Sequence, residues 1–384
     1  MSSKRIIILG GGFGGVSAAL AARSLLSTDH EIVLIDRNRR TYLCGSLPML
    51  IVGERESAKI SRSLGLLANR GIRYVQSEVE SIDIPSRIIS TSDANKMEYD
   101  YLIVATGASY DWDAVPGSSG AYSFYDLPSA RRLRRKLNHF RRGKLIIAVS
   151  NLPYKCPPAP YEMAMILDWH LTRAGVRNNI SIHLHTPEAA PLPIAGPHAT
   201  SRLKHDLDKR GIYLHTGSAI TAVSKNGREA SFSDGTHEDA DIISTIPTHR
   251  VPTLVSQAGL SDKSSWVEVS PKSLETCHSG VYAIGDVNMI SMSNGGLLPK
   301  AGVFASSEGL VAGRKIATAV NGSDPTEDFS GVGHCFVAYS GTRAGIIKGR
   351  FLAPDKPDVK FYPPTTRGYQ TKESFERNWR RFHI

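Results

Sequence analysis

The sequence of 384 residues predicts an α/β fold with two units of parallel sheet, followed by a strand-rich C-terminal segment. The first unit is indicated by an apolar strand at residues 5–9 that runs into a glycine-rich turn and an apolar helix at residues 16–26. A similar strand at residues 145–149 predicts a second unit, although its turn contains no glycine. Apolar strands that end near residues 107 and 286 indicate that distant segments complete the first unit.

The first turn holds Gly10, Gly12 and Gly15 in the spacing GxGxxG. Two of these glycines permit a tight turn and the close approach of a pyrophosphate, and the third permits close helix packing. The helix N-terminus then faces the phosphates. A second strand at residues 31–35 ends in Asp36, which would accept hydrogen bonds from ribose hydroxyls. This order of elements predicts a Rossmann-like dinucleotide site.

Two later segments indicate which dinucleotide is bound. Residues 101–107 (YLIVATG) and 280–286 (GVYAIGD) each end an apolar strand, and LPKAG at residues 298–302 precedes a helix that reaches about residue 319. Together they resemble the FAD-binding signature of glutathione-reductase-like two-domain flavoproteins. The resemblance implies that Asp286 binds the ribityl chain or a phosphate, and that the helix dipole and Lys300 face the flavin. The cofactor-binding residues expected in these segments are Thr106, Gly107, Gly285, Asp286 and Lys300.

The turn after the strand at residues 145–149 carries Cys156 in place of glycines, in the run KCPPAPYE. A backbone without glycine cannot approach a pyrophosphate closely, so the sequence predicts that a thiol replaces a nicotinamide nucleotide site. A helix is expected at residues 161–174. Its N-terminus and the adjacent Lys155 are expected to lower the pKa of the Cys156 thiol.

Two more residues are candidates for chemistry. Cys335 lies in an expected strand at residues 333–339, and from the residues alone both it and Cys156 are also consistent with buried structural thiols. Glu162 could act as a base for hydrosulfide, or it could be a first-turn acid that the helix dipole favours. Cys277 is expected to be structural.

The FAD fingerprint, KCPPAPYE, LPKAG and a late cysteine beside an aromatic residue resemble the sulfide:quinone oxidoreductases and the flavoprotein subunit of flavocytochrome c sulfide dehydrogenase. The resemblance covers nearly the whole chain. It implies that Cys156 and Cys335 form a redox disulfide beside the flavin, that sulfide attacks this disulfide, and that electrons pass through FAD to a membrane quinone. Sulfane sulfur would leave as polysulfide.

Other functions remain open at this stage. The electron acceptor could be a cytochrome c partner instead of a quinone. The chain could also be an NAD(P)H-dependent disulfide or quinone reductase, or a flavin-containing sensor without turnover. The missing second glycine turn argues against the NAD(P)H-dependent enzyme.

Cys44, in TYLCGSLP after Asp36, has three interpretations. It could be bonded covalently to the flavin, as the resemblance to flavocytochrome c sulfide dehydrogenase implies. It could be the catalytic thiol of a coenzyme A-disulfide reductase, although Ser46 interrupts the Cys-Gly-Leu-Pro motif of that family. It could also be a packed loop thiol.

The charged residues bear on partners and location. The net charge of +10 is concentrated at residues 129–144 and in a tail at 373–384 that also carries aromatic residues. These segments are either solvated faces or docking faces for an anionic membrane or an acidic protein, and no nucleic-acid motif is present. No membrane-spanning run or leader is evident. We therefore expect a peripheral membrane protein on the cytoplasmic side, or a periplasmic one if a leader has been removed.

The expected domains follow from these segments. Residues 1–126 and 249–319 form the FAD-binding domain, 127–248 the degenerate second Rossmann-like domain, and 320–384 a C-terminal segment with a basic amphipathic tail. No metal site is predicted, because the four cysteines lack the spacing of zinc ligands. His183, His185 and His198 are assigned no role for the same reason.

Overall fold

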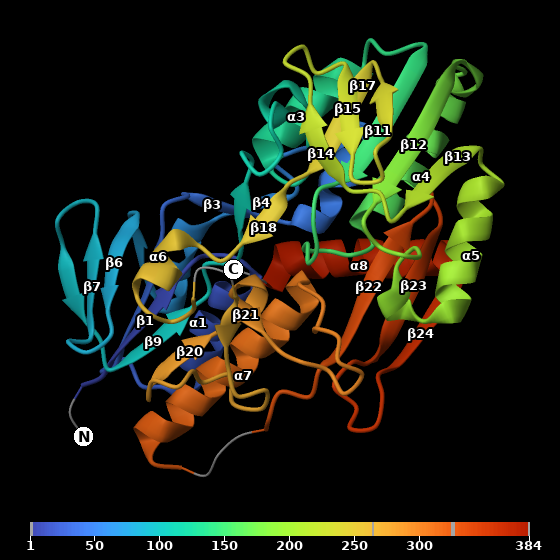
Figure 1. The fold of residues 1–384 in the computed structure, drawn as a ribbon. Coiled ribbons are helices and arrows are strands. Elements are labelled where there is room, and N and C mark those ends of the chain that lie inside the picture. Colours follow the sequence, from blue (N-terminus) through green and yellow to red (C-terminus); the bar gives the residue numbers. More distant parts are fainter. Residues whose placement is uncertain (1–2, 263–264, 324–326, 383–384) are drawn as a thin grey trace.

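The computed structural model describes residues 3–262, 265–323 and 327–382. The molecule is built around two parallel sheets and a C-terminal antiparallel sheet (Figure 1). The predicted fold class, α/β with two Rossmann-like units and a strand-rich C-terminal segment, is confirmed. The domain boundaries remain predictions.

The first sheet has five parallel strands in the order β20-β9-β1-β2-β5. Its central strand, IIIL after Arg5, is apolar on both faces because helices and further strands cover both sides. The strands are β1 (Arg5–Leu9), β2 (Glu31–Asp36), β5 (Arg73–Gln76), β9 (Tyr101–Val104) and β20 (Val281–Ala283).

Helices α1 (Phe13–Leu25) and α7 (Gly302–Asn321) lie side by side against this sheet (Figure 1). Their close contact requires glycine, because a Cβ on Gly309 would lie 2.2 Å from the carbonyl oxygen of Gly14. An antiparallel sheet of β6 (Val79–Asp83), β7 (Ile88–Thr91) and β8 (Lys96–Glu98) contributes Ile82, Ile89 and Met97 to the opposite core.

The second sheet has four parallel strands in the order β13-β12-β11-β17. One face carries an antiparallel layer of β14, β15 and β16, whose Ala230 and Phe232 pack with Ile146 and Ala148 of β11. The strands are β11 (Gly143–Val149), β12 (Ile180–Thr186), β13 (Ile212–Thr216), β14 (Ile220–Val223), β15 (Glu229–Phe232), β16 (His237–Asp239) and β17 (Ile242–Ile246). The helices of this unit are α3 (Leu127–Leu137), α4 (Ala159–Arg173) and α5 (Pro197–Asp208).

Two chain crossings join the units as a short ribbon, in which β10 (Ser109–Asp111) pairs antiparallel with β18 (Thr248–Arg250). The remaining short elements are β3 (Arg40–Tyr42), β4 (Ser61–Ser63), β19 (Val267–Glu268), β21 (Asn288–Met289), α2 (Leu47–Ile51) and α6 (Thr253–Gln257).

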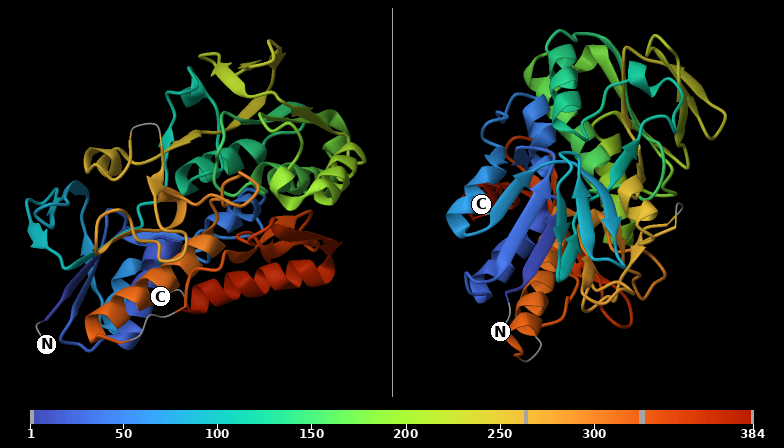
Figure 2. Two further views of the ribbon diagram at one scale, coloured as in Figure 1. Left: turned by 60° about the horizontal axis from the view of Figure 1, so that its bottom comes forward. Right: turned by 90° about the vertical axis from the view of Figure 1, so that its left-hand side faces the viewer.

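The C-terminal sheet consists of β22 (Val332–Ala338), β23 (Ala344–Arg350) and β24 (Asp358–Thr365). The last helix, α8 (Thr366–Phe382), begins before the expected tail and runs beneath these strands (Figure 2). In the described part of the chain, no helix combines the length and apolar character needed to cross a membrane.

Candidate active site

A cavity of about 400 Å³ lies where the carboxyl ends of β1, β9 and β20 meet. This is the edge at which parallel α/β sheets bind their ligands. The chain reaches the cavity directly after Leu9, Val104 and Ala283, which are neighbours in the register of the sheet. The predicted site residues that line it are Gly10, Gly12, Asp36, Cys44, Thr106, Gly107, Cys156, Glu162, Gly285, Asp286, Lys300 and Cys335.

The glycine turn has the geometry of a phosphate cradle. A Cβ on Gly10 would lie 2.3 Å from the Ala105 carbonyl oxygen, and one on Gly15 would lie 1.9 Å from the Gly10 oxygen. Gly12, in contrast, faces open space and is the N-cap of α1. The N-terminus of the helix dipole therefore faces the part of the cavity where no side chain shields the backbone.

Asp36 lies at the edge of the cavity and stabilises the glycine turn. Its Oδ2 accepts a hydrogen bond of 2.6 Å from the Gly11 amide, and its Oδ1 accepts one of 2.7 Å from Asn38. A carboxylate fixed in this way at the end of β2 is suited to accept further bonds from a ribose.

Besides Oε1 of Glu162, two buried polar atoms in the cavity wall have no hydrogen-bond partner among the described residues. They are Oδ1 of Asp286 and Oγ1 of Thr106. Buried polar groups are almost always paired in folded proteins, so this part of the wall is shaped for a polar ligand. Together with the glycine cradle, it fits a dinucleotide such as FAD.

Glu308 of α7 fixes the Asp286 turn, and the sequence analysis did not identify it. Its Oε2 accepts hydrogen bonds from the Gly285 amide at 2.6 Å and from Asn288 Nδ2 at 2.7 Å. Burial raises the pKa of Glu308 to about 8. An acidic residue inside the apolar run of 302–321 is the only signal that could have indicated it.

Lys300 lines the cavity, its ammonium is bonded within the wall, and its role as a cation at the flavin remains a prediction. Its ammonium donates hydrogen bonds to the carbonyl oxygens of Asp286 at 2.8 Å and Asn288 at 2.9 Å, and it lies 3.5 Å from the centre of the Trp266 ring. Burial lowers its pKa to about 8. The side chain therefore holds the turn, while the N-terminus of α7 faces the cavity.

Cys156 lies in a turn that is fixed by two backbone hydrogen bonds. Its amide donates to the Lys300 carbonyl at 2.7 Å, and its carbonyl accepts from Ala159 at 2.8 Å. The residue has φ of +57°, a left-handed conformation that is uncommon for a side chain other than glycine. This strained backbone turns Cys156 into the cavity wall.

The expectation of a lowered Cys156 pKa is wrong. Burial raises the pKa of this thiol well above its usual range, and the nearby Cys335 and Glu162 raise it further. Lys155 acts in the opposite direction but is weaker. Its ammonium lies over the ring of Tyr110 at 4.8 Å, and α4 begins only at Ala159.

Cys335 comes from β22, opposite Ile347 of β23, and lines the same cavity as Cys156. Both are free, half-buried thiols. Burial raises the pKa of Cys335 to about 12, with a further contribution from Glu162. The structure thus brings the two predicted cysteines to one cavity, and their pairing as a disulfide remains a prediction.

Glu162 lies between these thiols and the C-terminal helix. Its side chain is buried, and its Oε1 has no hydrogen-bond partner among the described residues. Burial raises its pKa to about 7, although Lys372 opposes the shift. A carboxyl group with a pKa near 7 can both donate and accept a proton at neutral pH.

The other two cysteines differ from each other. Cys44 begins a 3-10 turn (Cys44–Ser46) in the cavity wall, and burial raises the pKa of its thiol. All three interpretations of Cys44 remain open. Cys277 is exposed and lies outside the cavity wall, and its structural role remains a prediction.

The second parallel sheet has an acid where a nucleotide-binding unit would need one, but the acid is already bonded. Glu188 follows β12, and its Oε2 accepts hydrogen bonds from the hydroxyls of Tyr154, Tyr161 and Thr186. Glu188 is also buried. It therefore has little capacity left to accept bonds from a ribose.

Two aromatic residues of the basic tail, Phe375 and Trp379, are turned toward the protein. Phe375 lines the cavity, and Trp379 is 6% exposed with its ring 6.1 Å from that of Phe13. The expectation that this aromatic face docks on a membrane is therefore wrong for these two residues. Arg377 and Arg380 on the other face are exposed.

A family model described as pyridine nucleotide-disulphide oxidoreductase matches residues 4–149 and 161–320. The unmatched stretch, 150–160, holds the turn with Cys156.

Among curated proteins, the sulfide-quinone reductase of Aquifex aeolicus is 27% identical over 266 residues, which cover 67% of this chain and 61% of that protein. The match thus spans less than two thirds of that relative. The alternative NAD(P)H-ubiquinone oxidoreductase C1 of Arabidopsis thaliana is 26% identical over 359 residues, covering 83% of this chain and 67% of that protein. The crystal structure of the sulfide:quinone oxidoreductase from Aquifex aeolicus has a TM-score of 0.87 at 22% identity, covering 98% of this chain and 90% of the other.

Proposed function

Because the chain belongs to the pyridine nucleotide-disulphide oxidoreductase family and is an FAD-dependent oxidoreductase, we propose that it oxidises sulfide through Cys156 and Cys335 and delivers the electrons to a quinone. When bound, FAD supplies the acceptor for an electron pair and passes the pair to the quinone.

The observation that carries this proposal is the meeting of Cys156, Cys335 and Glu162 in the cavity of the glycine cradle. Cys156 comes from the turn before α4, and Cys335 from the C-terminal sheet. A packing role would not require two free thiols and a buried carboxyl group to share a wall with the cofactor site.

The chemistry of the pair follows from thiol–disulfide exchange. Hydrosulfide attacks one sulfur of the oxidised pair, the bond between Cys156 and Cys335 breaks, and one cysteine becomes a persulfide while the other leaves as a thiolate. High thiol pKa values make a poor leaving group, so the thiolate needs a proton. Glu162, with a pKa of about 7, can donate that proton.

In the second half of the reaction cycle, the two cysteines return to their oxidised state. Joining the persulfide to the remaining thiol as a trisulfide releases two electrons and two protons. The electron pair and one proton pass to FAD when it is bound, and the Glu162 carboxylate can accept the other proton, since it lost its own in the first exchange. A further sulfide can then remove the central sulfur as sulfane sulfur.

Two features disfavour NAD(P)H as the electron donor. The turn after β11 has no glycine, and Glu188 is bonded to tyrosine hydroxyls. A nicotinamide dinucleotide needs both a bare backbone and a free acid at these positions.

The acceptor site is proposed at an aromatic part of the cavity wall. His334, Phe336 and Phe375 lie there, with ring centres 5.3 Å apart for His334–Phe336 and 5.9 Å for Phe336–Phe375. A flat apolar quinone would stack on such a surface. Peripheral contact with an anionic membrane could then use the exposed Arg131 and Arg135 of α3.

The proposal is tested with Cys156→Ser and Cys335→Ser, each compared with Cys277→Ser, whose cysteine is exposed and lies outside the cavity wall. We expect both cavity variants to retain FAD and to lose sulfide-dependent flavin reduction, while the control keeps it. Full reduction in either cavity variant would refute the role of the pair.

A further inference from the structure

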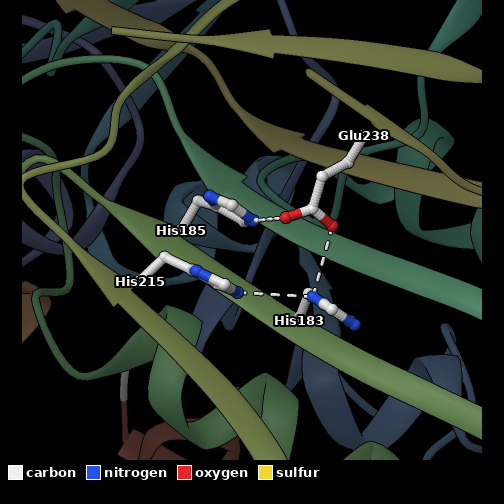
Figure 3. Close-up of side chains that lie close together, drawn as sticks. All are labelled: His183, His185, His215 and Glu238. Carbon is white, nitrogen blue, oxygen red and sulfur yellow. Dashed lines mark hydrogen bonds and ion pairs between the residues drawn. The ribbon is translucent and has the colours of Figure 1, made fainter. Parts of the chain in front are cut away.

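A cluster of three histidines and one glutamate lies on the second parallel sheet, away from the proposed chemistry. It consists of His183 and His185 of β12, His215 of β13 and Glu238 of β16 (Figure 3). One donor atom from each residue lies within 4.8 Å of all the others. None of the four lines the flavin cavity.

The sheet register explains why these side chains meet. His183 and His185 are two residues apart and therefore share a face of β12. His215 is the register partner of His185 on the adjacent parallel strand, so it lies on the same face. The antiparallel layer β14–β16 covers that face and supplies Glu238 from the opposite side.

Two of the donor pairs have the spacing of ligands on one metal ion, and the His185 and His215 rings, which are stacked at 4.1 Å, would turn so that both nitrogens face the ion. Nδ1 of His183 lies 3.3 Å from Nε2 of His215, and Nε2 of His185 lies 3.3 Å from Oε1 of Glu238. Zinc bonds of about 2.0–2.1 Å in tetrahedral directions place neighbouring donors about 3.3 Å apart.

His185 contributes a buried ring nitrogen that makes no hydrogen bond to the described residues. Its side chain is 1% exposed, and its Nε2 has no hydrogen bond within the described chain although it points at Glu238 (Figure 3). Its Nδ1 lies 3.0 Å from the Ser218 hydroxyl. A partner on one ring nitrogen fixes the tautomer and leaves the other nitrogen free to bind a metal.

Lys144 forms an ion pair with Glu238, so a metal ion in the cluster must leave room for this ammonium group. Its ammonium lies 3.1 Å from Oε2 of Glu238. If Oε1 binds the metal, Oε2 can keep this bond, and Lys144 then orients the carboxylate from outside. Burial lowers the pKa of both His183 and His185, so the imidazoles are neutral at pH 7, as metal ligands must be.

We propose that His183, His185, His215 and Glu238 bind one divalent transition-metal ion of the zinc class. Three imidazoles and a carboxylate suit Zn²⁺ and related first-row ions, not Mg²⁺ or Ca²⁺. Four protein ligands close the coordination sphere, so the ion is structural. It links the β14–β16 layer to the parallel sheet beneath it.

The test uses zinc and the FAD-loaded enzyme. Wild type, His215→Gln, Glu238→Gln and the control His198→Gln are exposed to Zn²⁺, freed of excess by gel filtration, and analysed for zinc per FAD. His198 is exposed on α5, outside the cluster. Zinc held by the cysteines is common to all four proteins, so only the difference between them counts. The FAD content reports folding independently.

We expect wild type and His198→Gln to hold one more zinc per chain than either cluster variant. Calorimetric titration should give an affinity at least about 100-fold weaker in His215→Gln and Glu238→Gln, since removal of a ligand should cost at least as much as removal of a supporting group. Zinc should raise the Tm of wild type and not that of the cluster variants. Equal zinc content in all four folded proteins would overturn the proposal.

Discussion

Nζ of Lys372 lies 4.0 Å from Oε1 of Glu162, in the wall that also carries Cys335. The ammonium makes its short contact elsewhere, at 2.7 Å from Glu376. Glu162 is therefore near a cation without a hydrogen bond to it, which leaves burial as the larger influence on its pKa of about 7. This balance makes Glu162 a proton donor and acceptor at neutral pH.

The first prediction concerns Glu162→Gln. The amide cannot donate a proton to the leaving thiolate, so we expect sulfide-dependent flavin reduction to slow by about 100-fold or more. At a fixed hydrosulfide concentration, the wild-type rate should fall as the pH rises through about 7, because the donor form of Glu162 is lost. Stopped-flow measurements from about pH 5.5 to about pH 9 should find no such inflection in the variant. An unchanged rate and profile would remove Glu162 from the mechanism.

Lys372→Met should move the same inflection to higher pH. Lys372 lowers the pKa of Glu162, so loss of the cation raises that pKa, by about one unit or more for a charge at this distance. Lys372→Arg keeps the positive charge and serves as the matched control. The measurement is again the pH profile of flavin reduction, and an inflection that stays in place in Lys372→Met would contradict the assigned coupling.

Gly10→Ala should abolish or greatly weaken FAD binding. The residue has φ of +105°, and the added Cβ would lie 2.3 Å from a backbone oxygen, so the turn must change shape. Gly65→Ala is the control, because its Cβ would meet only ordinary contact at 3.5 Å. The measurement is the amount of FAD per chain after gel filtration. Equal FAD occupancy in both variants would show that this turn does not bind the FAD phosphates.

FAD should be released when the wild-type protein is precipitated with acid. Burial raises the pKa of the Cys44 thiol, and a protonated thiol is a poor nucleophile toward a flavin. The supernatant absorbance measures the released flavin, with Cys44→Ser as the control. Flavin that stays with wild type but not with Cys44→Ser would favour covalent attachment and an acceptor of the cytochrome c type.

Local patterns predicted the first nucleotide unit well, because each of its parts is contiguous. The strand, the glycine turn and the following helix lie within residues 5–25, and Asp36 follows the next strand. The joining of distant segments could be inferred from the apolar strands, whereas the order of the strands in the sheet came from the structure. The register that aligns Leu9, Val104 and Ala283 required the structure.

Features that depend on burial were predicted less well. Residue spacing indicated a thiolate at Cys156, whereas the folded environment raises its pKa. The tail looked amphipathic, yet Trp379 is turned toward Phe13. Sequence cannot show what covers a helix face, because the covering residues come from distant elements.

The histidine cluster was missed for a related reason. His183 and His185 were visible as a pair with strand spacing, but His215 joins them only through the parallel register of β12 and β13. Glu238 lies on β16, in the antiparallel layer that covers the parallel sheet. Ligand sets built across strands leave no short motif in the sequence.

The most direct test of the central claim is the anaerobic flavin spectrum of the FAD-loaded protein, mixed separately with excess sulfide and with NADH. The proposal predicts rapid bleaching of the oxidised flavin band by sulfide, and no comparable bleaching by NADH, because the turn that holds Cys156 has no glycine and Glu188 is already bonded. Bleaching by NADH alone would contradict it, and would make the chain a pyridine-nucleotide oxidoreductase in which Cys156 and Cys335 have no redox role.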